Sequence, residues 1–285
     1  LCLLSSESKL CLLSVLVFVG VLGFLTTRYA AANVAIARSI ALANQNKGLE
    51  AYKEQSRALA LVNYNDGYHR VFSQTNLALA NSLSRSVPRD ASPSAQTQQT
   101  INTLIQQSIN SGKTATNLAL FTSANWQNLS LIYRSLIGVG RNADTFAIQA
   151  QQQAVLLDPN NPQQYINLGG LYYQLRDFDR AIELFRLAIN LKPDFANAYY
   201  NLGYALKEKG DIEGALEQLK IVKELVKNDK TNLDKITSEI KAIEEGLKVQ
   251  KGGPEKVETL PPQEPPVQIE PPTSNVAPPA SPSAQ

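Results

Sequence analysis

Few side chains in this sequence could do covalent or metal chemistry. Its 285 residues include one His, two Cys, one Trp and no Met. The two thiols, Cys2 and Cys11, lie at or within an apolar N-terminal stretch, so the rest of the chain has neither a disulfide framework nor a Cys-based zinc site. His69 is the only imidazole, and no Ser or Asp arrangement of a hydrolase triad is recognisable around it. We therefore expect no catalytic residue, no metal site and no cofactor in this chain.

The charge balance argues against another class of partner. Lys and Arg number 27 against 25 Asp and Glu, which gives a net charge of +2. This is too small to attract nucleic acid or an anionic surface over a distance, so we expect no nucleic-acid partner. Because the sequence contains no Met, we also expect a processed chain or the C-terminal part of a longer protein.

An apolar segment at residues 10–27 is just long enough to cross a membrane as a helix. A cleaved signal peptide is the alternative, since residues 30–32 are three alanines. Arg28 argues against cleavage, so a retained transmembrane helix is favoured, and residues 1–9 then belong to the end of a preceding segment or loop. A bacterial plasma membrane is the expected location. Lys9 and Arg28 offset each other, so the side on which the rest of the chain lies stays open.

Beyond the apolar segment, helical patterning continues without a convincing strand. Apolar spacing predicts two amphipathic helices with a break near Asn46–Gly48, and a third helix over residues 68–83. Pro88 and Pro93 mark a loop rather than a domain break. We assign residues 29–122 to degenerate helical pairs.

Residues 123–230 contain an internal repeat of 34 residues. Pro159 and Pro193 are separated by this interval. So are five identical pairs, namely Tyr165 and Tyr199, Asn167 and Asn201, Leu168 and Leu202, Gly169 and Gly203, and Ala181 and Ala215. Gly169 removes a side chain where a second helix must approach closely. Each helix pair leaves an apolar face that only the next pair can bury.

This pattern resembles the tetratricopeptide repeat (TPR) family, specifically over residues 126–227 and more loosely over 31–119. The signature residues, which we expect to be structural, are Trp126, Leu129, Tyr133, Tyr165, Leu168, Gly169, Tyr172, Ala181, Phe185, Ala188, Pro193, Tyr199, Leu202, Gly203 and Ala215. The resemblance implies an all-α fold, a TPR-type α-solenoid of antiparallel helix pairs, preceded by one transmembrane helix and followed by a disordered Pro-rich tail. About five extra residues around Gly138–Asn142 predict a longer first helix or turn in one repeat, compared with the 34-residue norm.

Two further segments follow the repeats. Residues 231–249 carry one apolar stripe, typical of a terminal capping helix with Thr231 as its N-cap, although a coiled-coil partner helix would show the same stripe. Residues 250–285 hold ten of the 15 prolines, and we expect them to be disordered or polyproline-like. The run Pro261–Pro266 could dock in an aromatic groove, although such tails more often act as spacers.

In TPR folds the inner, concave face is lined by first-helix positions, and the resemblance places partner binding there. In this chain those positions are Gln127, Arg134, Gln163, Tyr173, Asn197, Tyr200, Tyr204 and Lys207, with Leu131, Ile166 and Gly170 among them. A groove of Tyr, Gln and Asn suits an extended peptide or a polar glycan, whereas packing between repeats would also explain these residues. Arg134 and Lys207 are too few for a carboxylate clamp. The expected function is a membrane-anchored, non-enzymatic scaffold that binds other proteins or peptide segments.

A second resemblance suggests an alternative. The phrases Tyr64–Arg70 and Ile132–Val139 are similar to the C-terminal TPR regions of bacterial O-antigen ligase or polymerase-type membrane proteins. The chain would then be an accessory region of a multi-spanning enzyme of surface polysaccharide assembly. Catalysis would belong to spans outside this sequence, and the partners would include glycan-assembly components.

Overall fold

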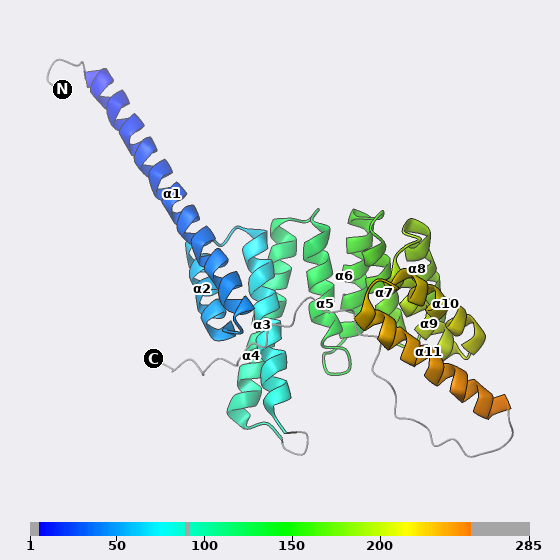
Figure 1. Cartoon of the computed structure of the whole chain (residues 1–285). Coiled ribbons are helices and arrows are strands. Elements are labelled where there is room, and N and C mark those ends of the chain that lie inside the picture. Colours follow the sequence, from blue (N-terminus) through cyan, green and yellow to red (C-terminus); the bar gives the residue numbers. More distant parts are fainter. Residues whose placement is uncertain (1–5, 89–91, 252–285) are drawn as a thin grey trace. The chain divides into compact units, whose positions relative to one another are not determined.

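The computed structural model describes residues 6–88 and 92–251, and every regular element in this part of the chain is a helix (Figure 1). In chain order the helices are α1 (Ser6–Asn44), α2 (Gly48–Leu61), α3 (Asp66–Ser86), α4 (Ala95–Leu118), α5 (Ser123–Arg134), α6 (Ala143–Leu157), α7 (Pro162–Gln174), α8 (Phe178–Leu191), α9 (Ala196–Lys209), α10 (Ile212–Leu225) and α11 (Lys230–Lys251). The expected all-α fold is confirmed. Residues 252–285, which include most of the Pro-rich segment, and residues 1–5 lie outside the described part.

The chain divides into two compact units, unit 1 up to Leu120 and unit 2 from Phe121. In unit 1, α1 pairs with α2 and α3 pairs with α4. In unit 2 the pairs are α5 with α6, α7 with α8 and α9 with α10, and α11 packs on α10. Helices α5, α7 and α9 are the first helices of their pairs, and α6, α8 and α10 are the second helices.

The apolar segment and the amphipathic helix that follows it form one continuous helix, α1. The sequence places a boundary after residue 27, but α1 continues through Arg28 to Asn44. Residues 12–27 are exposed, whereas from Ala32 onward one face of α1 packs against α2, and Figure 1 shows the N-terminal part extending beyond its partner. The predicted break at Asn46–Gly48 is confirmed, since Asn46 has a φ of 60° and α2 begins at Gly48.

The interior of unit 1 is partly polar. Gln55 is buried, and its side-chain amide donates to Ser39 Oγ at 3.3 Å and to Thr75 Oγ1 at 2.9 Å. Ser108 Oγ donates to the carbonyl of Ser73 at 2.8 Å, which joins α4 to α3. Buried polar groups that are hydrogen-bonded in this way are compatible with close helix packing. Because polar residues occupy interior positions, the sequence of unit 1 shows no regular apolar repeat.

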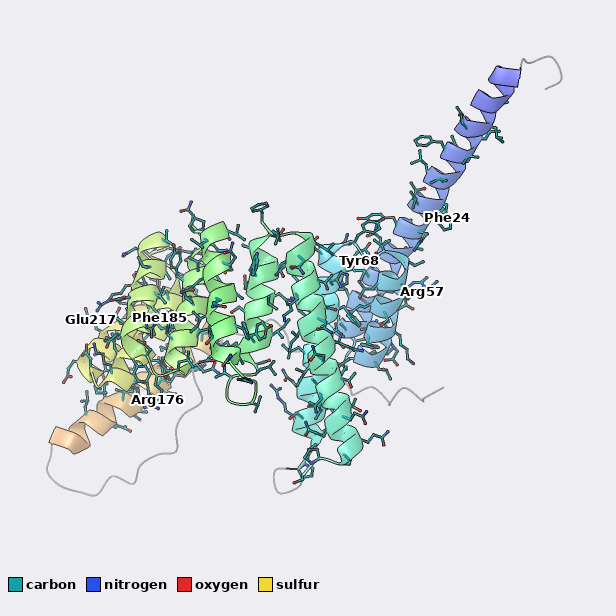
Figure 2. The ribbon with its side chains drawn as sticks, turned by 180° about the vertical axis from the view of Figure 1, so that it is seen from behind. Phe24, Arg57, Tyr68, Arg176, Phe185 and Glu217 are labelled. Atoms are coloured by element: carbon teal, nitrogen blue, oxygen red, sulfur yellow. The ribbon has the colours of Figure 1, made fainter. Side chains whose placement is uncertain are left out.

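The helix pairs of unit 2 pack through the small and large residues of the repeat. A Cβ atom at Gly169 would lie only 2.6 Å from Phe185 Cε1, so only glycine lets α7 approach α8 this closely. Phe185 is fully buried (0% exposed) and is labelled inside unit 2 in Figure 2. The second helices α8 and α10 begin alike, because Asp177 accepts from the backbone N–H of Arg180 and Asp211 accepts from that of Gly214.

Two expectations about local structure are resolved by the helix ends. The extra residues near Gly138 lengthen the turn rather than the helix, since residues 135–142 join α5 to α6 whereas residues 175–177 join α7 to α8. The prediction of Thr231 as an N-cap is wrong. Asp229 takes this role, because its Oδ1 accepts from the N–H of Asn232 at 3.2 Å, and its carboxylate is favoured beside the free amides at the start of α11.

Candidate functional site

Three tyrosines that the sequence places on the first helices lie close enough in unit 2 for the phenol of Tyr173 to interact electrostatically with those of Tyr200 and Tyr204. Tyr173 lies on α7, and Tyr200 and Tyr204 lie on α9 one turn apart, with ring centroids 4.8 Å from each other. All three side chains are half-buried. We call these three residues the tyrosine cluster.

Helix α11 and the end of α9 supply charged neighbours to the tyrosine cluster. The hydroxyl of Tyr200 donates to Glu239 Oε1 at 3.2 Å. The ammonium of Lys235 lies 5.4 Å from the Tyr200 ring centroid, and that of Lys207 lies 5.6 Å from the Tyr204 ring centroid. Both distances fall within the range of cation–π attraction. The cluster therefore combines aromatic rings with two cations and the carboxylate of Glu239.

Burial moves the pKa values of these phenols further above neutral pH. It raises the pKa of Tyr173 to about 12, with a further contribution from the negative charge of Glu208. Burial likewise raises the pKa of Tyr200 to about 12. The pKa of Tyr204 is raised by burial and by its hydrogen bond to the Tyr200 hydroxyl. At neutral pH all three groups are neutral hydroxyls that can both donate and accept hydrogen bonds.

A pocket of about 60 Å³ opens beside Tyr200, between α9, α10 and α11. Asn197 lines it together with Val226 and Lys235. Small-molecule sites typically enclose roughly 300–1,000 Å³, so this pocket is too small for a cofactor or a drug-sized ligand. Its size and mixed lining suit a single side chain of a bound peptide.

Arg134 bridges two repeats instead of standing free on the surface. Its Nε donates to Gln174 Oε1 at 3.0 Å, and its Nη2 donates to the carbonyl of Gly170 at 3.3 Å. Burial lowers the pKa of its guanidinium. A Cβ at residue 170 would lie 3.3 Å from Arg134 Nη1, so Gly170 makes room for the guanidinium. The structure thus places Arg134 in a contact between α5 and α7.

The predicted glutamines also make hydrogen bonds within the solenoid. Gln127 Oε1 accepts from the side-chain amide of Gln164 at 3.1 Å, and Gln164 in turn accepts from the buried Gln151 at 2.8 Å. Gln163 donates to Asn167 Oδ1 at 2.8 Å. These amides bond to other residues of the repeats, so the structure gives Gln127 and Gln163 contacts within the solenoid. No sequence signal marks Gln151 and Gln164, because hydrogen-bonded core amides have no characteristic spacing.

The other residues that the sequence singled out make contacts within the fold. Ile166 is 2% exposed, so it packs inside the unit instead of lining a groove. Asn201 is buried and donates to the carbonyl of Asn197 at 2.7 Å. In unit 1, His69 Nε2 lies 2.8 Å from the carbonyl of Asn63 and so serves as a donor there. No group of three or more His, Cys, Asp or Glu side chains in the described residues could hold a metal ion.

Comparison with known proteins identifies the repeat. Residues 171–210 match the family model described as TPR repeat, a segment that runs from the last turn of α7 through α9. All three residues of the tyrosine cluster lie within this segment. No curated protein matches the chain.

Solved structures show the same fold. A crystal structure of MamA protein is 19% identical, with a TM-score of 0.51, and the match covers 70% of this chain and 94% of that chain. A thermophilic TPR protein of Thermus thermophilus is 17% identical, with a TM-score of 0.53 and coverage of 73% and 98%. A MamA fragment from Desulfovibrio magneticus is 16% identical, with a TM-score of 0.52 and coverage of 70% and 97%. These likenesses show that the described part of the chain has the fold of a TPR-type α-solenoid.

Proposed function

We propose that this TPR-type solenoid is a membrane-anchored scaffold that binds an extended peptide segment of another protein through the first-helix face of unit 2. The tyrosine cluster is the observation that carries the proposal. Half-buried tyrosines offer a large apolar area at a low cost in side-chain entropy, and their hydroxyls can pair with a peptide backbone.

The surroundings of the cluster favour a peptide over other ligands. The pocket beside Tyr200 has a volume of about 60 Å³, which is large enough for one side chain of a bound peptide. Lys207 and Lys235 lie beside the rings, and the carboxylates of Glu208 and Glu239 balance their charge, so the site suits a polar peptide with no strong net charge. The charged hollow of about 400 Å³ between α8 and α9 is a weaker candidate, since Lys209 and Asp179, which line it, pair with each other.

The anchor in this proposal is α1. Within the described residues it is the one helix that is long and apolar enough to cross a membrane. Its residues 12–27 are exposed in the folded chain, and exposed side chains of this kind need either lipid or a partner to cover them.

Photocrosslinking tests the binding surface. A photoreactive phenylalanine analogue at Tyr204 should crosslink, in the native host, to one discrete segment that mass spectrometry can map. The same analogue at Leu187, an exposed residue of the second helix α8, is the matched control. Tyr204 is preferred over Tyr200, because Tyr200 also holds α11 through Glu239. Equal crosslinking at Tyr204 and Leu187 would exclude the proposed face.

A second proposal assigns the chain to a larger glycan-assembly enzyme, as an accessory region of an O-antigen ligase or polymerase-type protein. Its support is the resemblance of Tyr64–Arg70 and Ile132–Val139, which the fold places at the start of α3 and from α5 into the turn that follows it. Sequencing the reading frame upstream of Leu1 separates the two proposals. Several further hydrophobic spans would favour the enzyme, and a single short leader would favour the free-standing scaffold.

A further inference from the structure

One end of unit 1 exposes apolar and aromatic side chains at the level where α1 leaves the unit. Four residues form this surface, which we call the interfacial patch. They are Tyr29 (41% exposed), Tyr64 (62%), Leu118 (42%) and Leu120 (52%). They come from α1, from the connection between α2 and α3, and from the end of α4 and the residues after it.

Hydrogen bonds hold the connection between α2 and α3 at the level of Arg28 and Tyr29. Arg28 Nη2 donates to the carbonyl of Leu61, the last residue of α2, at 2.7 Å. The side-chain amide of Asn65 donates to the hydroxyl of Tyr29 at 3.4 Å. Tyr64 lies between these two contacts in the sequence. Its backbone is therefore held near the turn of α1 that follows the apolar run, and its ring is exposed there.

The end of α4 reaches the same level. Ser108 Oγ donates to the carbonyl of Ser73, which sets the register of the antiparallel helices α3 and α4. Asp66, the first residue of α3, lies seven residues before Ser73, and Ala115 lies seven residues after Ser108. Equal helical rises therefore bring the last turn of α4, which ends at Leu118, level with the start of α3 and the connection that precedes it. Neighbouring helices lie about 8–10 Å apart, and the patch therefore extends sideways across the helices of unit 1.

The connections at the opposite end of unit 1 have a different surface. They are residues 45–47, after α1, and the described parts of residues 87–94, after α3. They consist mostly of Asn, Gln, Lys, Ser and Pro, and no large apolar side chain is exposed in their described residues. Ile40, which is 48% exposed, lies a full turn before α1 ends. The exposed aromatic and apolar residues of the connections are thus at the end from which the apolar helix emerges.

We propose that the interfacial patch lies in the headgroup region of the same bilayer that α1 spans, so that unit 1 rests on the membrane surface. This inference depends on the proposed membrane anchor. Tyrosine side chains favour the membrane–water interface, where the ring meets lipid and the hydroxyl meets water. Arg28 marks this level on α1 itself, because its guanidinium lies 5.5 Å from the ring centroid of Phe24, which is labelled in Figure 2. The patch gives unit 1 a second membrane contact beside its anchor.

Spin-label depth measurements test the proposal on the full chain. The two cysteines are replaced (Cys2→Ser and Cys11→Ser), and a nitroxide is attached through Tyr64→Cys or Leu120→Cys. The protein is reconstituted into vesicles of phosphatidylcholine and phosphatidylglycerol. Power saturation then compares collisions with oxygen, which is concentrated in the bilayer, and with a water-soluble nickel chelate. Phe18→Cys reports the middle of the apolar run, and Ser86→Cys reports the opposite end of unit 1.

We expect the labels at residues 64 and 120 to show several-fold less collision with the nickel chelate than the label at residue 86, and a depth near the lipid phosphates. If the label at 18 lies deep but those at 64 and 120 match the label at 86, the patch proposal fails and the anchor stands. If the label at 18 is also water-accessible, the anchor itself fails. Labels at 64 and 120 that are shielded from both reagents would show burial against protein and would overturn the patch.

Discussion

Units 1 and 2 are both built from antiparallel helix pairs, but different residues fill their interiors. The largest fully buried side chain in the described part of unit 2 is Phe185, which packs against the backbone at Gly169. In unit 1 it is Leu79, and there the polar side chain of Gln55 is buried to a similar degree and joins three helices. A helix pair of this type therefore does not require the large and small residues of the repeat.

The difference between the two units agrees with the different roles that we propose for them. Unit 2 carries the tyrosine cluster on helices of regular spacing, whereas unit 1 contains the apolar helix and the interfacial patch. A regular array suits a surface that must be repeated along a bound peptide. An attachment to the membrane needs only one rigid helix pair, and hydrogen-bonded polar contacts can make such a pair specific.

The largest effect should follow from removal of the main aromatic side chain of unit 2. Phe185→Ala should lower the free energy of unfolding by about 3–5 kcal/mol, because it deletes a ring that is 0% exposed and leaves a cavity. The single Trp, Trp126, lies in α5 of unit 2, so urea unfolding followed by its fluorescence reports on this unit. Leu187→Ala, two residues on and exposed, should change the value by less than about 0.5 kcal/mol. Equal effects of the two substitutions would contradict the packing described.

A smaller loss should follow from a single added methyl group. Gly169→Ala should destabilise unit 2 by about 1–3 kcal/mol through overpacking, because the new Cβ would lie 2.6 Å from Phe185 Cε1. Gly246→Ala in α11 is the matched control, since a Cβ there has no neighbour within 4 Å, and it should stabilise the helix. The double variant Gly169→Ala with Phe185→Leu should recover part of the loss. Additive losses would show that the two residues do not share a contact.

These particular contacts show how far the sequence could predict the fold. The spacing of Gly169 and Phe185 identifies the repeat because close packing of two helices restricts both residues. The break after Asn44 was also predictable, since Asn and Gly tolerate a positive φ. The continuity of α1 through Arg28 was not predicted, because the end of an apolar run shows where a helix leaves a membrane and does not show where the helix itself ends.

The candidate site was predicted less completely than the fold. Tyr173, Tyr200 and Tyr204 could be placed on one face from the repeat alone. Their neighbours Lys235 and Glu239 could not, since α11 lies outside the repeat and its packing angle is set by tertiary contacts. Arg134, Gln127 and Gln163 have the sequence spacing of positions on the concave surface. Their long side chains nevertheless make hydrogen bonds within the solenoid, which spacing alone does not predict.

A polar substitution tests the interior of unit 1. Gln55→Leu should lower the free energy of unfolding by about 1–2 kcal/mol, because the hydroxyls of Ser39 and Thr75 lose a hydrogen-bond partner. Far-UV circular dichroism in urea measures this loss. Arg57→Ala, an exposed position of the same helix labelled in Figure 2, is the control and should have little effect. If Gln55→Leu stabilises the protein, apolar burial outweighs these hydrogen bonds, and the contrast between the two interiors is weaker than described.

The effect that is smallest at neutral pH concerns the tyrosine cluster, because it appears only when the pH is alkaline. Burial raises the pKa of Tyr173 and of Tyr200 from 10.0 to about 12, so the unfolded chain releases these phenolic protons at a lower pH than the folded protein does. The stability that the two groups contribute is therefore fully present below pH 10 and is lost as the pH rises to about 12. The double variant Tyr173→Phe with Tyr200→Phe should show a shallower alkaline decline in urea unfolding followed by Trp126 fluorescence. Tyr64→Phe, at an exposed position in unit 1, should leave the slope unchanged. If the free energy of unfolding falls with pH equally in the wild type and the double variant, water and α11 already stabilise the ionised phenols. The cluster would then be more open to water than its burial indicates.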